Sequence, residues 1–362
     1  MPLPIIIGAA ALAAAAFGAK KGYDGYQKHS EANEIVEIAN NRYKIRKETL
    51  DSQEKSTQFS LNRLGKMKLD IGMKFNEFKT LSDSLLSKLN ECRQDKLECN
   101  IPKCELEKVE DYSCTAIGVL SGLAGAGATG AAAGFAVYGG VMALGAASTG
   151  TAISSLAGAA ATNATLAAIG GGSLASGGLG IAGGTTILGA AVAAPVLAIA
   201  GWAYDNHGKE SLINAEKINA NVEEILIKLD KSKKLLSDTE EYSHKIEQTL
   251  SSLYRQFNHY FSSLQDIDKF INGIKGRNVD VEAEIAKCGN SILKMVENGY
   301  ALAAIMTDII VTPILKLKTI YGMASLDEYG VPEMQKNTDG LAILNKDALD
   351  MVLTKAADSY RI

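Results

Sequence analysis

The stretch LSSLYRQFNHYFSSLQDIDKFINGI, Leu250–Ile274, decides the fold. Its apolar residues recur at alternating steps of three and four, at Leu250, Leu253, Phe257, Tyr260, Leu264, Ile267, Ile271 and Ile274. This spacing puts them in one stripe along a helix, as is typical of a coiled coil. The same stripe continues upstream to about Ser211 without a proline. The pattern therefore predicts one long amphipathic helix over about 211–274.

A second long helix is predicted between about Glu31 and Cys99. Its apolar residues are separated by three, four or sums of these steps, at Leu61, Leu64, Ile71, Phe75, Phe78, Leu85 and Leu89. Two amphipathic rods joined by a long insert bury their stripes most simply by folding back on each other. We therefore expect these two helices to pair antiparallel, with the insert at one end of the rod.

The remaining C-terminal sequence predicts further helices. A turn is expected at 271–280, where two glycines and an Asn follow the last heptad. A third helix is expected over about 281–310, bent or ended by Pro313. Its predicted apolar side consists of Ile285, Cys288, Ile292, Met295, Leu302 and Ile305. A loop at 321–340 and a short helix at 341–360 follow, and no segment alternates with a period of two, so no sheet is expected.

Between the two arms, residues 112–204 contain no Lys, Arg, Asp or Glu. This segment also holds 21 of the 35 glycines, so it differs physically from its charged neighbours. Flexible linkers are polar, whereas this segment has Ile, Leu, Val and Phe at regular intervals, which favours helices over disorder. The chain as a whole has a net charge of -4 and no basic face with interleaved aromatics, so nucleic acid is not an expected partner.

Small residues recur at every fourth position of the uncharged segment and of the N-terminus. They are Gly118, Gly122, Ala126, Gly130 and Gly134, then Gly150, Ser154 and Gly158, and Ala10, Ala14 and Gly18. This spacing makes a flat groove into which another helix packs at close backbone distance. The pattern predicts a glycine zipper for helix packing within or between chains.

Glycine doublets and triplets divide the uncharged segment into predicted helices at 113–138, 141–169 and 185–204. The first and last are long enough for a hydrocarbon core that needs about 20 residues. Both flanks belong to one rod, which predicts an even number of crossings and, most simply, a hairpin. Tyr112, Trp202 and Tyr204 at its base are either membrane-interface aromatics or ordinary packing residues.

The lipid preference of such a helix is weak. Residues 113–138 include six of the Leu, Ile, Val and Phe type, and together these favour the bilayer by only about 2 to 4 kcal/mol. A lone helix of this kind needs packing partners in lipid. The same weakness allows the segment to stay folded against the rod, or hidden in an oligomer, before insertion.

Three further features leave alternatives open. The apolar run Leu3–Ala19 has no basic residue before it, and is either a retained membrane-active helix or a cleaved atypical leader. Asp308, alone in an apolar stretch, is either a pore-lining or switch residue or a solvent- or Lys-facing residue of the bundle. Four cysteines form a cluster: Cys92, Cys99, Cys104 and Cys114. Their spacing lacks a Cys-x-x-Cys pair, which disfavours a zinc site. The spacing does not decide whether these cysteines are reduced or form disulfides.

Two family resemblances follow from these segments. A long helical rod interrupted by one hydrophobic hairpin, with another apolar helix near a terminus, resembles the cytolysin A-type α-pore-forming toxins. The stretch STGTAISSLAGAAATNATLAAIGGGSLASGGLGIAGGTTILGAAVAAP, Ser148–Pro195, resembles the glycine-rich core of the interferon-inducible 6-16 family of membrane proteins and its bacterial look-alikes. The resemblances imply membrane insertion after oligomerisation.

The sequence thus predicts an all-α protein, an elongated antiparallel helical bundle or coiled coil with an inserted Ala/Gly-rich hydrophobic hairpin. The predicted parts are an N-terminal apolar helix at 1–22, a long helix at 23–111, a membrane-interacting region at 112–204, coiled-coil helices at 205–322, and a loop and helix at 323–362. No phosphate loop, nucleophile elbow or metal ligand set occurs, so we expect no enzyme and no cofactor.

Two functions fit this organisation. The first is a membrane-inserting, pore-forming or permeabilising effector that assembles as a homo-oligomer, with or without a partner protein, and is soluble before insertion. The second is a coiled-coil scaffold or membrane-remodelling protein that is permanently anchored in a bilayer. Both place the protein at a membrane, and neither decides between the cytoplasmic side and secretion.

Overall fold

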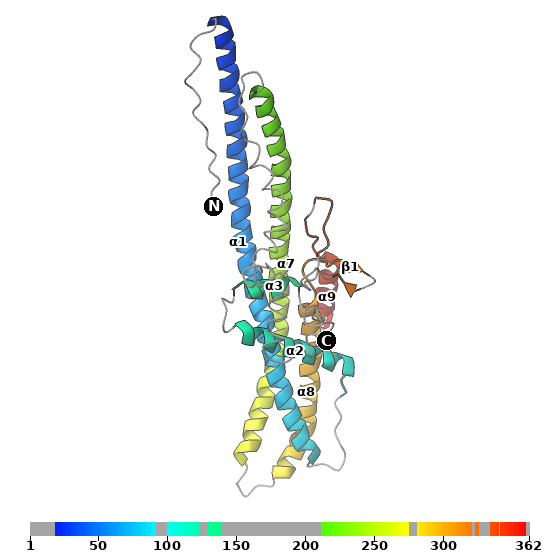
Figure 1. Ribbon diagram of the computed structural model, residues 1–362. Helices are drawn as coiled ribbons and strands as arrows, with labels where there is room; N and C mark the ends of the chain where they lie inside the picture. The colour runs from blue at the N-terminus through cyan, green and yellow to red at the C-terminus, as the bar shows by residue number, and fades with distance from the viewer. Residues whose placement is uncertain are drawn as a thin grey trace. The chain divides into compact units, whose positions relative to one another are not determined.

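The computed structural model shows an all-α protein, as the sequence predicts (Figure 1). Its helices are α1 (Ala19–Glu91), α2 (Lys103–Leu123), α3 (Thr129–Tyr138), α7 (Ser211–Ile274), α8 (Val281–Val311) and α9 (Lys346–Ser359). The structure describes residues 19–91, 100–123, 129–138, 211–274, 281–320, 323–325, 334–339 and 341–359.

The chain divides into two compact units. The first consists of Met1–Lys55, Leu188–Ser237 and Thr338–Leu341. The second consists of Ser56–Ile187, Asp238–Asn337 and Ala342–Ile362. Both α1 and α7 contribute to each unit, while α2, α3, α8 and α9 belong to the second.

In each unit α1 and α7 run parallel, so the predicted antiparallel pairing of these two helices is wrong (Figure 1). In the first unit Arg42 pairs with Glu223, and Arg46 pairs with Asp230. In the second unit the partners again advance together along both helices. They are Ser56 with Glu240, Arg63 with Glu247, and Lys88 with Asp268. A parallel pair needs a connection that returns to its starting end, so an insert at one end of an antiparallel rod does not fit this pairing.

The predicted apolar stripes form the core of the bundle. All seven stripe residues of α1, from Leu61 to Leu89, are at most 1% exposed. On α7 the stripe is buried as predicted at Leu250, Leu253, Phe257, Leu264 and Ile271. The register differs at Tyr260, which is half-buried while its neighbour Phe261 is buried, and the predicted Ile267 is also only half-buried. Phe261, four residues after Phe257, is buried because its ring packs against Phe78 of α1, with ring centroids 5.9 Å apart.

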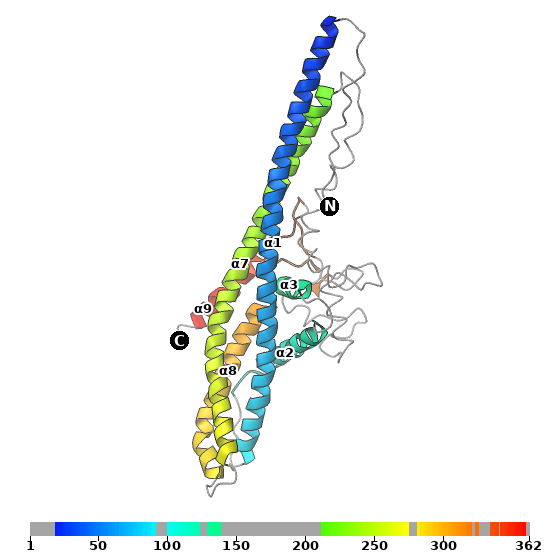
Figure 2. The same cartoon turned by 90° about the vertical axis from the view of Figure 1, so that its left-hand side faces the viewer.

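The buried side of α8 differs from the predicted one. Ile292 is buried as expected, but Met295, Leu302 and Ile305 are only half-buried. The core positions are instead Val296, Tyr300, Ala303, Met306, Ile309 and Ile310. The difference arises because α8 is contacted on more than one side, by α1 through Tyr300 and Phe78 and by α2 and α9 (Figure 2).

The helix ends follow local chemistry. α8 ends at Val311, two residues before Pro313, as predicted, and the Thr312 hydroxyl donates to the carbonyl of Asp308 at 2.7 Å. α2 begins directly after Pro102, whose carbonyl accepts the first helical amide bonds at 3.0 and 3.2 Å. α1 begins at Ala19, twelve residues earlier than the predicted Glu31, and ends at Glu91.

The sequence predicted no sheet, and this prediction is wrong in one small region. Two short antiparallel strands, β1 (Thr319–Ile320) and β2 (Met323–Ala324), pair within the stretch that follows α8. Isolated bridges join Leu315 with Leu344 and Leu317 with Met334. These pairings are too short to give a period-two pattern, so the sequence carries no signal for them.

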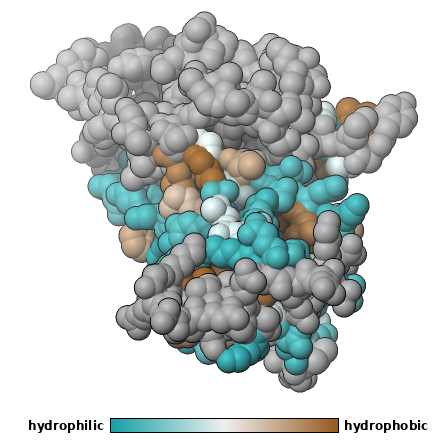
Figure 3. Space-filling model, turned by 90° about the horizontal axis from the view of Figure 1, so that it is seen from below, coloured by the Kyte–Doolittle hydropathy of each residue, from teal (hydrophilic) through white to brown (hydrophobic). Residues whose placement is uncertain are grey.

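Exposed apolar side chains are scattered on the described surface. On the face seen in Figure 3, hydrophobic residues lie in small patches among hydrophilic ones. Phe59, Phe270 and Met351 are examples, each more than half exposed. Single exposed apolar residues are normal for a folded protein and mark no site by themselves.

Candidate functional site

The start of the uncharged segment packs across α1 in the second unit. Figure 2 shows α2 and α3 on one side of α1, opposite α9. We call Gly65, Lys68 and Gly72 of α1 the docking face, because α3 and α2 meet α1 there. The three residues are separated by three and four positions and therefore share one side of the helix.

Two glycines allow this close approach. A Cβ atom at Gly65 would overlap the carbonyl oxygen of Ala132 and lie 3.1 Å from its Cα. A Cβ atom at Gly72 would overlap the Cβ of Ala116 and lie 3.1 Å from the ring of Tyr112. Any side chain at these positions must push α3 or α2 away from α1. These are close small-residue contacts, but their glycines lie on the charged arm, and Ala132 and Ala116 are not among the residues of the predicted zipper.

Lys68 lies between these glycines and is fully buried. Its Nζ donates to the carbonyls of Ala136 and Ile310, each at 3.2 Å. Both carbonyls belong to the last turn of a helix, α3 in one case and α8 in the other, where carbonyls have no partner within the helix. One side chain therefore joins the C-terminal ends of two helices to α1. Burial is the cause that lowers the pKa of Lys68 to about 7, and the negative ends of the two helix dipoles offset only part of that effect.

The surroundings of Lys68 are apolar and aromatic. The Tyr112 hydroxyl donates to the backbone carbonyl of Lys68, and its ring lies 6.2 Å from the rings of both Phe75 and Phe135. Phe135 is fully buried on α3. This cluster links α1, α2 and α3 into one packed core.

All described side chains of α3 are buried. Ala132, Phe135, Ala136, Val137 and Tyr138 are each at most 7% exposed. The amide of Ile314, just after α8, donates to the carbonyl of Val137 at 2.9 Å. The carbonyls at the end of this short helix are thus satisfied by groups from α1 and from the chain after α8.

Ion pairs hold the charged first half of α2. Lys79 of α1 lies 3.2 Å from Glu110, and Lys108 lies 3.2 Å from Asp308 of α8. Lys355 of α9 also pairs with Asp308, at 3.1 Å. Asp308 is about 28% exposed, and the lysines are more exposed, so each pair contributes roughly 0.2 to 1 kcal/mol. Asp308 therefore occupies the Lys-facing environment that was one of its two predicted alternatives.

The other predicted site residues are placed as follows. Gly118 lies in α2, and a Cβ there would meet nothing within 4 Å, so it is not at a close contact in this structure. Gly122 belongs to α2, and Gly130 and Gly134 belong to α3. Tyr112 is buried in the core of the second unit. The remaining predicted residues lie outside the described ones: Ala10, Ala14, Gly18, Ala126, Gly150, Ser154, Gly158, Trp202 and Tyr204.

The predicted helices of the uncharged segment are only partly described. Where one helix was expected over 113–138, the structure has α2 and α3. α2 begins at Lys103, so it joins charged and uncharged sequence in one helix. The predicted helices at 141–169 and 185–204 lie outside the described residues. Cys104, Cys114 and Cys288 are free thiols, and Cys92 and Cys99 lie outside the described residues.

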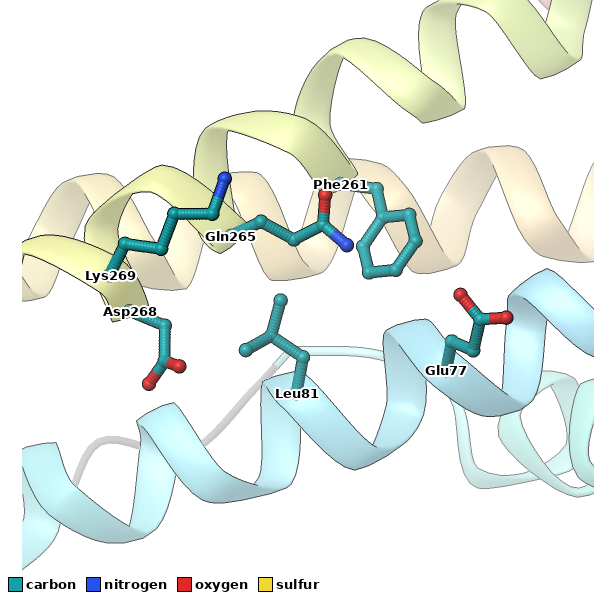
Figure 4. Close-up of a pocket in the computed structure, with 6 residues that line it drawn as sticks. All are labelled: Glu77, Leu81, Phe261, Gln265, Asp268 and Lys269. Atoms are coloured by element: carbon teal, nitrogen blue, oxygen red, sulfur yellow. The ribbon is translucent and has the colours of Figure 1, made fainter. Parts of the chain in front are cut away.

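A shallow groove between α1 and α7 is a weaker candidate. It has a volume of about 350 Å³ and is lined by Glu77, Leu81, Phe261, Gln265, Asp268 and Lys269 (Figure 4). Its carboxylates are spread along two helices, and Asp268 is already paired with Lys88 at 2.8 Å. Within the described ranges no cluster of His, Cys, Asp or Glu is arranged to hold a metal ion. The groove therefore offers no evident chemistry.

The docking face was missed by sequence reasoning, although a signal existed. Gly65 and Gly72 stand seven residues apart in the interior of a long predicted amphipathic helix. Glycine destabilises a helix interior by roughly 0.5 to 1 kcal/mol relative to alanine, so it is expected there only where something approaches closely. The pattern Gly-x-x-Lys-x-x-x-Gly places the lysine on the same side.

Comparisons with known proteins add no further assignment. No protein-family model, curated protein or solved structure matches this chain. In the part of the chain that the structure describes, no helix combines the length and apolar character needed to cross a bilayer.

Proposed function

We propose that this protein is an oligomeric, membrane-inserting effector that permeabilises a lipid bilayer. The form described above is its state before insertion, with the start of the uncharged segment packed against the helical bundle. One observation carries the proposal: the apolar side chains of α3 are hidden against α1 and α8 through small-residue contacts and one buried lysine.

The contacts at the docking face fit storage of a segment that later leaves. The contacts at Gly65 and Gly72 depend on close approach, and on release they separate together with the contact between Tyr112 and Phe75, without rebuilding the long helices. The pairing of α1 with α7 uses its own stripe and its own ion pairs, among them Arg63 with Glu247. Release of α2 and α3 therefore leaves the coiled-coil part of the bundle intact.

The magnitudes explain why insertion requires assembly. Burying Phe135 and Val137 in the docked state is worth roughly 3 to 6 kcal/mol together. Transfer of residues 113–138 to lipid as a lone helix returns only about 2 to 4 kcal/mol. The two free energies are of similar size, so insertion of one helix by itself gains little. Packing of several small-residue helices in the bilayer, from one chain or from several, supplies the difference.

A permanently anchored scaffold is the second candidate, and the long parallel pairing of α1 and α7 favours it. Paired amphipathic helices of this length are common in proteins that hold assemblies at a fixed spacing. In that function the uncharged segment stays in the membrane at all times. The two proposals therefore differ in whether the full chain is soluble without detergent.

Purification without detergent, followed by dye release from lipid vesicles, separates the two. The effector proposal predicts soluble full-length protein that releases an entrapped fluorophore from vesicles in a concentration-dependent manner. Protein that requires detergent and binds vesicles without leakage supports the scaffold. Soluble protein that neither binds vesicles nor releases dye contradicts both proposals.

A further inference from the structure

We propose that Lys68 is a proton-operated latch, so that charging its side chain weakens the docking of α3 and primes release of the uncharged segment. The inference rests on the proposed function for its biological meaning. The docking equilibrium that it describes is a property of the protein in water, without a membrane.

The first step concerns the partners of Lys68. Its Nζ lies 3.2 Å from two backbone carbonyls, those of Ala136 and Ile310. A neutral amine has two N–H donors, which match these two acceptors. A charged ammonium has a third donor and a full charge to solvate. In a fully buried position whose partners among the described residues are two backbone carbonyls, the neutral form is therefore the better fit.

The second step concerns the other titratable groups around it. From α2 the Tyr112 hydroxyl faces the backbone of Lys68, and from α8 the nearest acid in sequence to Ile310 is Asp308. Asp308 is bound by Lys108 and Lys355, and so it faces two positive charges of its own. On α3 the described residues Ala132, Phe135, Ala136 and Val137 carry no ionisable group, and Tyr138 is a neutral phenol. On α1 the neighbours Lys66 and Asp70 are partly or fully exposed.

The direction in which pH changes the docking of α3 follows from the pKa of Lys68 in the docked and released states. Burial lowers the pKa of docked Lys68 to about 7, from an ordinary value of 10.5 that the hydrated side chain regains on release. Between these values the released state binds more protons than the docked state, so docking weakens as the pH falls. Below about pH 7 both states are protonated and the effect levels off. Acidification is therefore the direction that opens the latch.

The expected size follows from the same two values. At pH 8 about nine-tenths of docked chains hold a neutral Lys68, and at pH 6 about one-tenth do. The docking equilibrium constant therefore falls about tenfold between pH 8 and pH 6, which corresponds to about 1.4 kcal/mol. Exposed carboxylates remain ionised over this range, so they contribute little to the change.

Hydrogen exchange of the full chain in solution tests the latch. Rates are expressed as protection factors, which remove the intrinsic pH dependence of exchange. The wild-type amides of α3 should lose about tenfold of their protection between pH 8 and pH 6, while those of α7 keep theirs. Lys68→Met, which is neutral at every pH, should abolish the loss. Lys66→Met on the exposed side of the same helix is the matched control and should behave as wild type.

An equal loss in Lys68→Met and wild type, or pH-independent protection of α3 in wild type, overturns the latch. If Lys68→Met does not fold, the wild-type profile decides alone, because a loss that grows as the pH falls toward 7, levels off below about pH 7 and is confined to α2 and α3 is specific to this site. A loss spread evenly over α7 and α8 contradicts it. No vesicles are present, so the result is independent of whether the protein permeabilises membranes.

Discussion

Replacing Gly65 by alanine is a demanding test of the docking face. In an open helix interior this change stabilises a protein by roughly 0.5 to 1 kcal/mol through helix propensity. At Gly65 the added Cβ overlaps the backbone of Ala132, so α3 must move. Overpacking of this kind costs about 1 to 3 kcal/mol, and the movement also stretches the bond from Lys68 to Ala136. We expect a net weakening of α3 docking by about 1 to 2 kcal/mol.

The matched control is Gly118→Ala in α2, where nothing lies within 4 Å of the added atom. Hydrogen exchange gives the local readout: α3 amides in Gly65→Ala should lose protection by about 5- to 30-fold, while Gly118→Ala keeps it or gains slightly. The comparison is informative because Gly118 belongs to the predicted zipper and Gly65 does not. If Gly65→Ala protects α3 as well as wild type or better, α3 does not pack on α1 as described.

Two further predictions concern the uncharged segment and its anchoring. Replacing Gly122 and Gly130 together by leucine should abolish dye release from vesicles while circular dichroism shows the long helices intact; unchanged leakage would count against packing through small residues. Asp308→Asn removes both pairs with Lys108 and Lys355 and should lower the free energy of unfolding by about 1 kcal/mol in low salt. The difference in unfolding free energy between Asp308→Asn and wild type should shrink in 1 M NaCl, because the Debye screening length falls there to about 3 Å. A loss of stability that does not depend on salt points to another cause.

The apolar stripes were predictable because helical spacing is a local property of the chain. Leu61 to Leu89 and Leu250 to Ile271 are buried largely where the steps of three and four place them. The helix boundaries at Ser211, Ile274 and Val281 also follow from local signals, namely the loss of the stripe and the glycines near 273–276.

The direction of the α1 and α7 pair was not predictable from the stripes. An apolar seam is equally well buried by a partner that runs either way, and direction is set by the charges beside the seam. Pairs such as Arg63 with Glu247 and Lys88 with Asp268 are formed in the parallel register. The simplest connection therefore gave the wrong answer, because the stripes carry no information on direction.

The docking face lay outside the prediction for a different reason. A glycine zipper was sought where glycines are dense, whereas the glycines at the close contacts stand singly in α1. Tertiary contact, and not composition, gives Gly65 and Gly72 their function. Lys68 was equally hidden, since a lysine in a charged arm is ordinarily solvated, and it is the packing of α2, α3 and α8 against α1 that buries this one.

A reversible bridge between α1 and α2 tests the central claim most directly. Lys79 and Glu110 face each other at 3.2 Å, and both side chains are partly exposed. In a variant with the five native cysteines replaced, Lys79→Cys and Glu110→Cys can be joined by a bis-maleimide that contains a cleavable disulfide. If α2 must leave α1 before insertion, the bridged protein releases no dye from vesicles, and reduction of the bridge restores release. Equal release from the bridged and the reduced protein would contradict the account.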